Sequence, residues 1–135
     1  MIRLLLAGVL ALGLSAATAQ ETRDGSIERV ITDQIAAFQA DDFDTAFTFA
    51  SPGIRRLFGS ADRFGRMVRQ HYPMVHRPGA VRFLDQREAG KIRRQRVLIR
   101  DGAGAFHTLF YDMIDTPGGW QIDGVQILSE PQVGA

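Results

Sequence analysis

Hydrophobic and polar residues follow two different periods in the two halves of this chain. From Ile27 to His71, apolar residues recur every three or four positions, which is the spacing of helices with one buried face. From Val81 to Leu128, apolar and polar residues alternate, which is typical of half-buried strands. The chain is therefore predicted to form helices first and an antiparallel sheet afterwards.

Residues that favour helix ends divide the first half into segments. Asp24 or Ser26 can cap a first helix. Its buried face contains Ile27, Val30, Ile31, Ile35 and Phe38. Asp41 or Asp42 can cap a second helix, which ends at Ser51-Pro52-Gly53. The buried residues of this second helix are Phe43, Ala46, Phe47 and Ala50.

Two further helical segments precede the strands. Ile54–Phe58 is predicted to be one helical turn closed by Gly59. Ser60 caps a longer helix, and Tyr72-Pro73 stops it. The apolar face of that helix contains Phe64, Met67, Val68 and His71. We expect a loop at His76–Gly79 before the first strand.

Four strands joined by short turns are predicted in the second half. Val81–Glu88 is the first strand and Lys91–Asp101 the second. Gly102-Ala103-Gly104 is a three-residue hairpin loop with glycine at the left-handed position. This loop length aligns Ile99 with His107, Val97 with Leu109, Gln95 with Tyr111, and Arg93 with Met113. The same argument does not determine the register of the first strand.

The last hairpin, Phe106–Leu128, organises the sheet. A turn at Thr116–Gly119 pairs Met113 with Ile122. The alternation then shifts by one residue, and a bulge at Asp123-Gly124 restores it. The inner face then contains Leu109, Tyr111, Met113, Trp120, Ile122, Val125 and Ile127.

The outer face of this sheet carries both apolar and charged residues. Phe110, Ile114 and Leu128 make it too apolar for a face that is wholly solvated. Arg94, Arg96 and Arg100 form a basic stripe near Phe110 and Asp112. The stripe is either a binding surface for an anionic partner or a solvated strand face that discourages edge pairing. We favour the second interpretation.

The first residues resemble a signal peptide rather than part of the domain. Arg3 precedes the apolar run Leu4–Leu14, and Ala17-Thr18-Ala19 fits a cleavage signal. The run is short for a bilayer span, and no cysteine follows it to carry a lipid anchor. We expect a signal peptide at residues 1–19, cleavage before Gln20, one domain over 20–135, and a periplasmic or secreted protein without a stable membrane anchor.

Composition excludes several classes of site. The chain has no cysteine and three histidines without short spacing, so neither disulfides nor a zinc signature is present, and no metal or cofactor is expected. Residues 54–100 hold 13 basic residues against Asp62, Asp85 and Glu88. Without Arg3, however, 15 basic residues balance 15 acidic ones. We therefore expect no nucleic-acid binding.

Many positions resemble one known family. They are Asp33-Gln34-Ile35, Phe38, Asp41-Asp42, Ala46-Phe47, Ala50-Ser51-Pro52, Phe58-Gly59, Phe64, Met67-Val68, Tyr72-Pro73, Arg77-Pro78, Gln95, Val97, Tyr111 and Trp120–Val125. Together they resemble a secreted proteobacterial family catalogued as domain of unknown function 4864, within the nuclear transport factor 2-like, or cystatin-like α+β, superfamily. His76 stands where an aromatic residue is expected.

This resemblance implies a fold but no activity. The superfamily implies an α+β fold in which N-terminal helices pack on a curved four-stranded antiparallel meander, with a cone-shaped pocket between them. It also implies frequent homodimers through the sheet. The family brings no known substrate or catalytic residues.

Five residues are candidates for lining a ligand pocket. Tyr111 and Gln95 face inward, either as a polar pair at the base of a pocket or as a core tyrosine satisfied by a neighbouring glutamine. His71 and Tyr72 end a helix near the expected mouth, where a histidine is either a general base or, more often, a helix terminator. Arg93 can reach the rim.

Three functions fit these observations. The first is an exported, non-catalytic binding module with a small apolar pocket that takes an apolar or anionic ligand. The second is an isomerase- or hydrolase-type enzyme that uses Tyr111 with His71 or Asp112. The third is a protein-interaction adaptor whose pocket is filled by side chains.

Overall fold

The computed structural model describes the backbone of residues 15–128 and the side chains of residues 26–128. The helices are α1 (Ser15–Gln39), α2 (Phe43–Thr48), α3 (Pro52–Phe58), α4 (Ala61–His71) and α5 (Pro73–His76). The strands are β1 (Pro78–Ala89), β2 (Ile92–Asp101), β3 (Phe106–Thr116) and β4 (Gly119–Leu128). Helices followed by an antiparallel sheet confirm the predicted α+β class.

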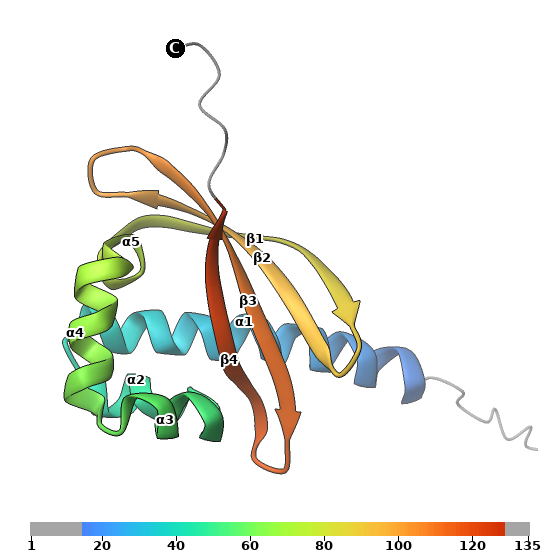
Figure 1. Cartoon of the computed structure of the whole chain (residues 1–135). Coiled ribbons are helices and arrows are strands. Elements are labelled where there is room, and N and C mark those ends of the chain that lie inside the picture. The colour runs from blue at the N-terminus through green and yellow to red at the C-terminus, as the bar shows by residue number, and fades with distance from the viewer. Residues whose placement is uncertain (1–14, 129–135) are drawn as a thin grey trace, which may run out of the picture.

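The four strands form one open sheet in the order β1-β2-β3-β4, so each strand pairs with its neighbours in sequence. The sheet is strongly twisted, and α1 runs across one of its faces (Figure 1). Helices α2, α3 and α4 lie together near the C-terminal half of α1 (Figure 1). The helices thus cover one face of the sheet, as expected for two packed layers around one core.

The core lies between α1 and the inner face of the sheet. Ile27, Ile31 and Phe38 of α1 are buried, and they fall on one helical face. On the sheet, the buried residues are Gln95, Val97, Ile99, Leu109, Tyr111, Met113 and Ile122. The alternating pattern therefore identified the inner face correctly, although Ile127 at the end of β4 is exposed.

The predicted register between the last three strands is confirmed. Ile99 pairs with His107, Val97 with Leu109, Gln95 with Tyr111, and Arg93 with Met113. Gly104 has a φ of 90°, so the loop requires glycine at that position. Strands β3 and β4 pair Met113 with Ile122 and Asp112 with Gly124, which leaves Asp123 as the predicted bulge.

The helix caps agree with the sequence at several points. Asp42 and Ser60 each accept a hydrogen bond from a backbone N–H in the first turn of the helix that follows, as predicted. Ser51 was expected only to end the second helix, but it caps α3 in the same way. Gly59 ends α3 with a φ of 79°. Helix α3 begins at Pro52 rather than at Ile54, because proline suits the first position of a helix.

Two predictions about the helices were wrong. Helix α1 begins at Ser15 rather than at a cap formed by Asp24 or Ser26. The residues before Asp24 include three alanines, Gln20 and Glu21, which favour helix over a cap. The expected loop at His76–Gly79 is also largely absent: His76 ends a short helix, α5, and β1 begins at Pro78. Pro73 ends α4 but can start a new helix.

The predicted signal peptide lies largely outside the described residues, and cleavage before Gln20 stays a prediction. Helix α1 runs through that position. Within the described part of the chain, no helix is both long enough and apolar enough to cross a membrane.

Candidate functional site

A cavity of about 680 Å³ lies between the helical layer and strands β3 and β4. Residues from α1, the α2–α3 connection, α3, α4, α5 and both strands line it. They are Gln34, Phe38, Ala50, Ile54, Leu57, Phe58, Phe64, Met67, Val68, His71, Tyr72, Val75, Tyr111, Ile122, Gly124, Val125 and Ile127. The volume falls within the usual range for small-molecule sites.

The helical wall of the cavity is built on Phe64 of α4. Its ring centroid lies 5.6 Å from that of Phe58, 5.8 Å from that of Phe38 and 5.3 Å from that of Phe47. Such tilted pairs are favoured beyond simple burial. Because these rings come from four helices, they fix the helical wall relative to α1.

The strand wall is held by the bulge in β4. The buried Ser51 hydroxyl donates to Oδ1 of Asp123, the bulge residue, over 2.7 Å. The Ser51 amide also donates to the Ile122 carbonyl oxygen, and the Ile122 amide donates to the Phe49 carbonyl oxygen. These bonds attach the start of α3 to β4 and hold two sides of the cavity together.

The mouth of the cavity is apolar. Leu57 of α3 is 74% exposed and Ile127 of β4 is 37% exposed, and both line the cavity. Large apolar side chains are exposed at few places in the described residues; the other two are Phe106 and Leu128. An exposed apolar rim around a concave apolar surface is typical of a binding site.

Tyr111 contributes a buried hydroxyl to the wall, at the position expected from the sequence. Its side chain is fully buried, and its hydroxyl has no hydrogen-bond partner among the described residues. Burial raises the pKa of this phenol far above its ordinary value, and the neighbouring Tyr72 raises it further. Tyr111 therefore stays protonated near neutral pH and can donate a hydrogen bond, but it cannot act as a base.

The other polar groups of the cavity already have partners or lie at its edge. The Tyr72 hydroxyl donates to the Val125 carbonyl oxygen over 2.9 Å. The Gln34 amide donates to the carbonyl oxygen of Ala46 over 3.2 Å. His71, the last residue of α4, is exposed. Among the described lining residues there is no carboxylate.

Only three of the five candidate residues line this cavity. Tyr111, His71 and Tyr72 do, whereas Gln95 and Arg93 do not. The Gln95 amide donates to the carbonyl oxygens of Leu84 and Arg96 over 3.0 and 2.8 Å. It therefore satisfies the backbone near the bulge of β1 instead of Tyr111.

Arg93 and two arginines of the stripe, Arg94 and Arg96, form ion pairs elsewhere on the sheet. Arg93 pairs with Glu88 over 2.6 Å. On the outer face, Arg94 pairs with Asp112 over 2.7 Å and lies over the Phe110 ring. Arg96 pairs with Asp85 over 2.6 Å. Asp112 is thus engaged on the face opposite to the cavity.

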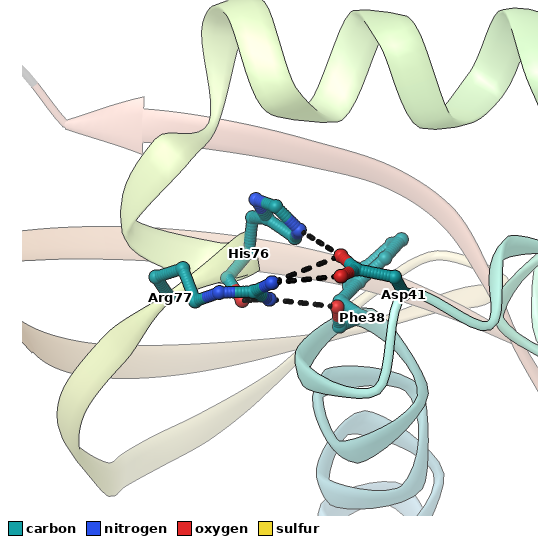
Figure 2. A network of polar contacts seen from close by, with 4 residues as sticks. All are labelled: Phe38, Asp41, His76 and Arg77. Carbon is teal, nitrogen blue, oxygen red and sulfur yellow. Dashed lines mark hydrogen bonds and ion pairs between the residues drawn. The ribbon is translucent and has the colours of Figure 1, made fainter.

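Sequence reasoning missed two pairs of histidine and aspartate. His76 lies 2.7 Å from Asp41, and His107 lies 2.7 Å from Asp101. Arg77 also contacts both carboxylate oxygens of Asp41 and donates to the Phe38 carbonyl oxygen (Figure 2). Asp41 and His76 are 35 positions apart, so local spacing gave no signal. Neither histidine lines the cavity.

A metal site has no support in the described residues. They contain no group of three or more histidine, aspartate or glutamate side chains placed to hold an ion. The chemistry that the cavity offers is therefore apolar contact, one buried hydroxyl donor, and an imidazole at its edge.

Comparison with known proteins identifies the family. No curated protein and no solved structure is significantly similar to this chain. One family model, described as "Domain of unknown function (DUF4864)", matches residues 20–135, which is most of the chain. The chain therefore belongs to this family of unknown function.

Proposed function

We propose that this domain is a non-catalytic binding module that holds a small apolar molecule in the cavity between α3, α4 and β4. The observation that carries the proposal is the apolar lining together with its exposed rim at Leu57 and Ile127. Burial of apolar ligand surface is favourable by roughly 25 cal/mol per Å². Exposed leucine and isoleucine at the mouth would lose contact with water when a ligand enters.

The enzyme alternative has less support. It needs Tyr111 to act with His71 or Asp112. Asp112 is bound to Arg94 on the outer face of the sheet. Tyr111 stays protonated because its pKa is raised. Among the described lining residues, His71 alone could serve as a general base, and it lies exposed at the edge of the cavity. The adaptor alternative, with a cavity filled by side chains, fits a volume of about 680 Å³ poorly.

The proposal also covers the type of fold, the location of the protein and its assembly. We assign the domain to the cone-shaped nuclear transport factor 2-like type, because the helices cover one face of a twisted four-stranded sheet. It acts after export and removal of residues 1–19, in the periplasm or outside the cell. The apolar residues on the outer face support a homodimer through the sheet.

Binding can be tested with N-phenylnaphthylamine, a neutral dye whose fluorescence rises in apolar surroundings. We expect the wild-type domain to bind the dye and Leu57→Ser to bind it severalfold more weakly without a change in thermal stability. Phe106→Ser is the matched control, because Phe106 is 67% exposed but does not line the cavity. Equal effects of the two substitutions, or no binding by the wild type, would refute the proposal.

A further inference from the structure

The Tyr111 hydroxyl is a buried donor that has no hydrogen-bond partner among the described residues. It lies in the wall of the cavity, on the inner face of β3. A buried polar group without a hydrogen bond is costly, and native proteins seldom keep one. Phenylalanine would fill nearly the same volume without that cost, so the hydroxyl needs an explanation.

Neighbouring polar side chains do not supply the missing partner. Gln95 faces Tyr111 across β2 and β3. However, its amide donates to backbone carbonyls, and its Oε1 accepts from Nε2 of Gln86 over 2.6 Å. Tyr72 donates its hydroxyl to the Val125 carbonyl oxygen. Gln95 and Tyr72 thus already have hydrogen-bond partners within the protein and do not bind the Tyr111 hydroxyl.

We propose that the Tyr111 hydroxyl anchors the ligand of this cavity by donating a hydrogen bond to one uncharged oxygen, such as that of a ketone, an ester or an alcohol, on an otherwise apolar molecule. This inference rests on the proposed binding function. It adds a class of ligand and an orientation, with the oxygen of the ligand at the sheet and its apolar part toward Leu57.

An uncharged oxygen is favoured by the surroundings. Among the described lining residues there is no arginine or lysine, and His71 is exposed at the edge. A carboxylate beside Tyr111 would lose its hydration without meeting an opposite charge, which is far more costly than burying a neutral oxygen. A pure hydrocarbon has no acceptor and would leave the hydroxyl without a hydrogen bond.

Engagement of Tyr111 requires a small movement. Its side chain is 0% exposed, so the hydroxyl lies just behind the open volume rather than in it. Tyr72 lines the cavity and is close enough to affect the ionisation of Tyr111. We expect side chains that cover the hydroxyl to shift when the oxygen of the ligand reaches it.

Four probes with one common phenylbutyl frame can test the ligand class: butylbenzene, phenylbutanone, phenylbutanol and phenylbutanoate. Their affinities are measured by displacement of N-phenylnaphthylamine from the wild type and from Tyr111→Phe. We expect the substitution to weaken phenylbutanone and phenylbutanol by about three- to tenfold, which is the range for one neutral hydrogen bond. Butylbenzene should change by less than about twofold, because it makes no hydrogen bond.

Tyr72→Phe is the matched control. It removes a hydroxyl that also belongs to the cavity wall but that already has a partner in Val125. We expect it to change the affinities of butylbenzene and phenylbutanone by the same factor. If Tyr111→Phe also affects both probes equally, or neither, the anchor is refuted while the binding function stands.

Two further outcomes are decisive. If phenylbutanoate binds the wild type more tightly than phenylbutanone at neutral pH, the ligand is anionic and the inference is wrong. If the wild type binds neither the dye nor any probe, the proposed function fails, and the inference with it. Should Tyr111→Phe not fold, the infrared carbonyl stretch of phenylbutanone bound to wild type decides: a shift to lower frequency than in hexane supports the hydrogen bond, and no shift refutes it.

Discussion

Single residues decide how the end of α1 meets the rest of the molecule. Asp41 has a φ of 54°, in the left-handed region where glycine is usual. The amides of Asp41 and Asp42 donate to the carbonyl oxygens of Phe38 and Ala37, which closes α1. The side chain of Asp41 then binds His76 and Arg77 (Figure 2). A glycine would suit the backbone better but could not make these contacts.

The carboxylate of Asp41 should make stability depend on pH at the acid side. Hydrogen bonds from His76 and then Arg77 hold the pKa of Asp41 below its usual value. A lowered folded pKa means that the contribution is present above the unfolded pKa of about 4 and is lost as pH falls through the folded value. We expect thermal unfolding of Asp41→Asn to depend less on pH below about 4 than that of the wild type.

Asp33→Asn is the control for this measurement, because Asp33 is exposed on α1. A pH profile of Asp33→Asn that follows the wild type would assign the difference to Asp41. If Asp41→Asn also follows the wild type, the charge of Asp41 in the contacts of Figure 2 contributes nothing to stability.

Tyr111 should control stability at alkaline pH. Burial raises the pKa of its phenol in the folded state above the ordinary value of about 10. The unfolded chain therefore loses this proton first, and stability falls as pH rises above about 10. We expect Tyr111→Phe to be at least as stable as the wild type at pH 7 and to lose less stability between pH 9 and about 11.

Chemical denaturation at a series of pH values measures this effect. Tyr72→Phe serves for comparison, since Tyr72 is the only other tyrosine of the chain. It should retain the alkaline loss that Tyr111→Phe lacks. Identical alkaline profiles for wild type and Tyr111→Phe would mean that the phenol is more accessible than its burial indicates.

At the scale of elements, α4 approaches α2 closely because Gly65 has no side chain. A Cβ at Gly65 would lie 2.6 Å from a ring atom of Phe43. That ring cannot easily move, since it packs against Phe38, His76 and Arg69. The glycine thus sets the distance between two helices that support the cavity.

Gly65→Ala should therefore destabilise the domain. Overpacking costs typically about 1–3 kcal/mol, and it would oppose the gain in helix propensity of about 1 kcal/mol. We expect a net loss in the free energy of unfolding, measured with urea. Gly53→Ala in α3 is the control, because its added Cβ meets side chains only at 3.8 Å. Stabilisation by both substitutions would show that α2 and α4 can separate at no cost.

The sequence predicted the pairing of neighbouring strands better than the contacts between elements that are far apart in the chain. The loop Gly102-Ala103-Gly104 sets the register of β2 and β3, and the shift in alternation at Asp123 marks the bulge, because both depend on neighbours in sequence. The partner of Asp123 is Ser51, 72 positions away, and no local pattern indicates it. The register of β1 likewise required the structure, which pairs Phe83 with Val97.

At the scale of the whole molecule, the helices cover one face of the sheet, and the homodimer that we propose uses the other face. Phe110 is half-buried there, beneath the guanidinium of Arg94. A glutamate at this position would place a charge in the centre of a dimer interface, which is costly to bury. We expect Phe110→Glu to sediment as a monomer where the wild type sediments as a dimer.

Leu57→Glu, on the helical side, is the control and should leave the dimer intact. The wild type must itself be a dimer for the comparison to hold. A monomeric wild type, or no change in the sedimentation of Phe110→Glu, would remove the sheet-mediated dimer from the proposal.

The sequence by itself determined the class of fold, the inner face of the sheet and the N-terminal caps of α2 and α4, because periodicity, turn residues and caps act over a few neighbouring positions. Only the tertiary structure decided which polar residues meet. Gln95 binds the backbone of β1, His76 binds Asp41, and the Tyr111 hydroxyl in the cavity wall has no partner within the described part of the chain. Such pairings depend on distances between elements that are far apart in the chain, where sequence spacing carries no information.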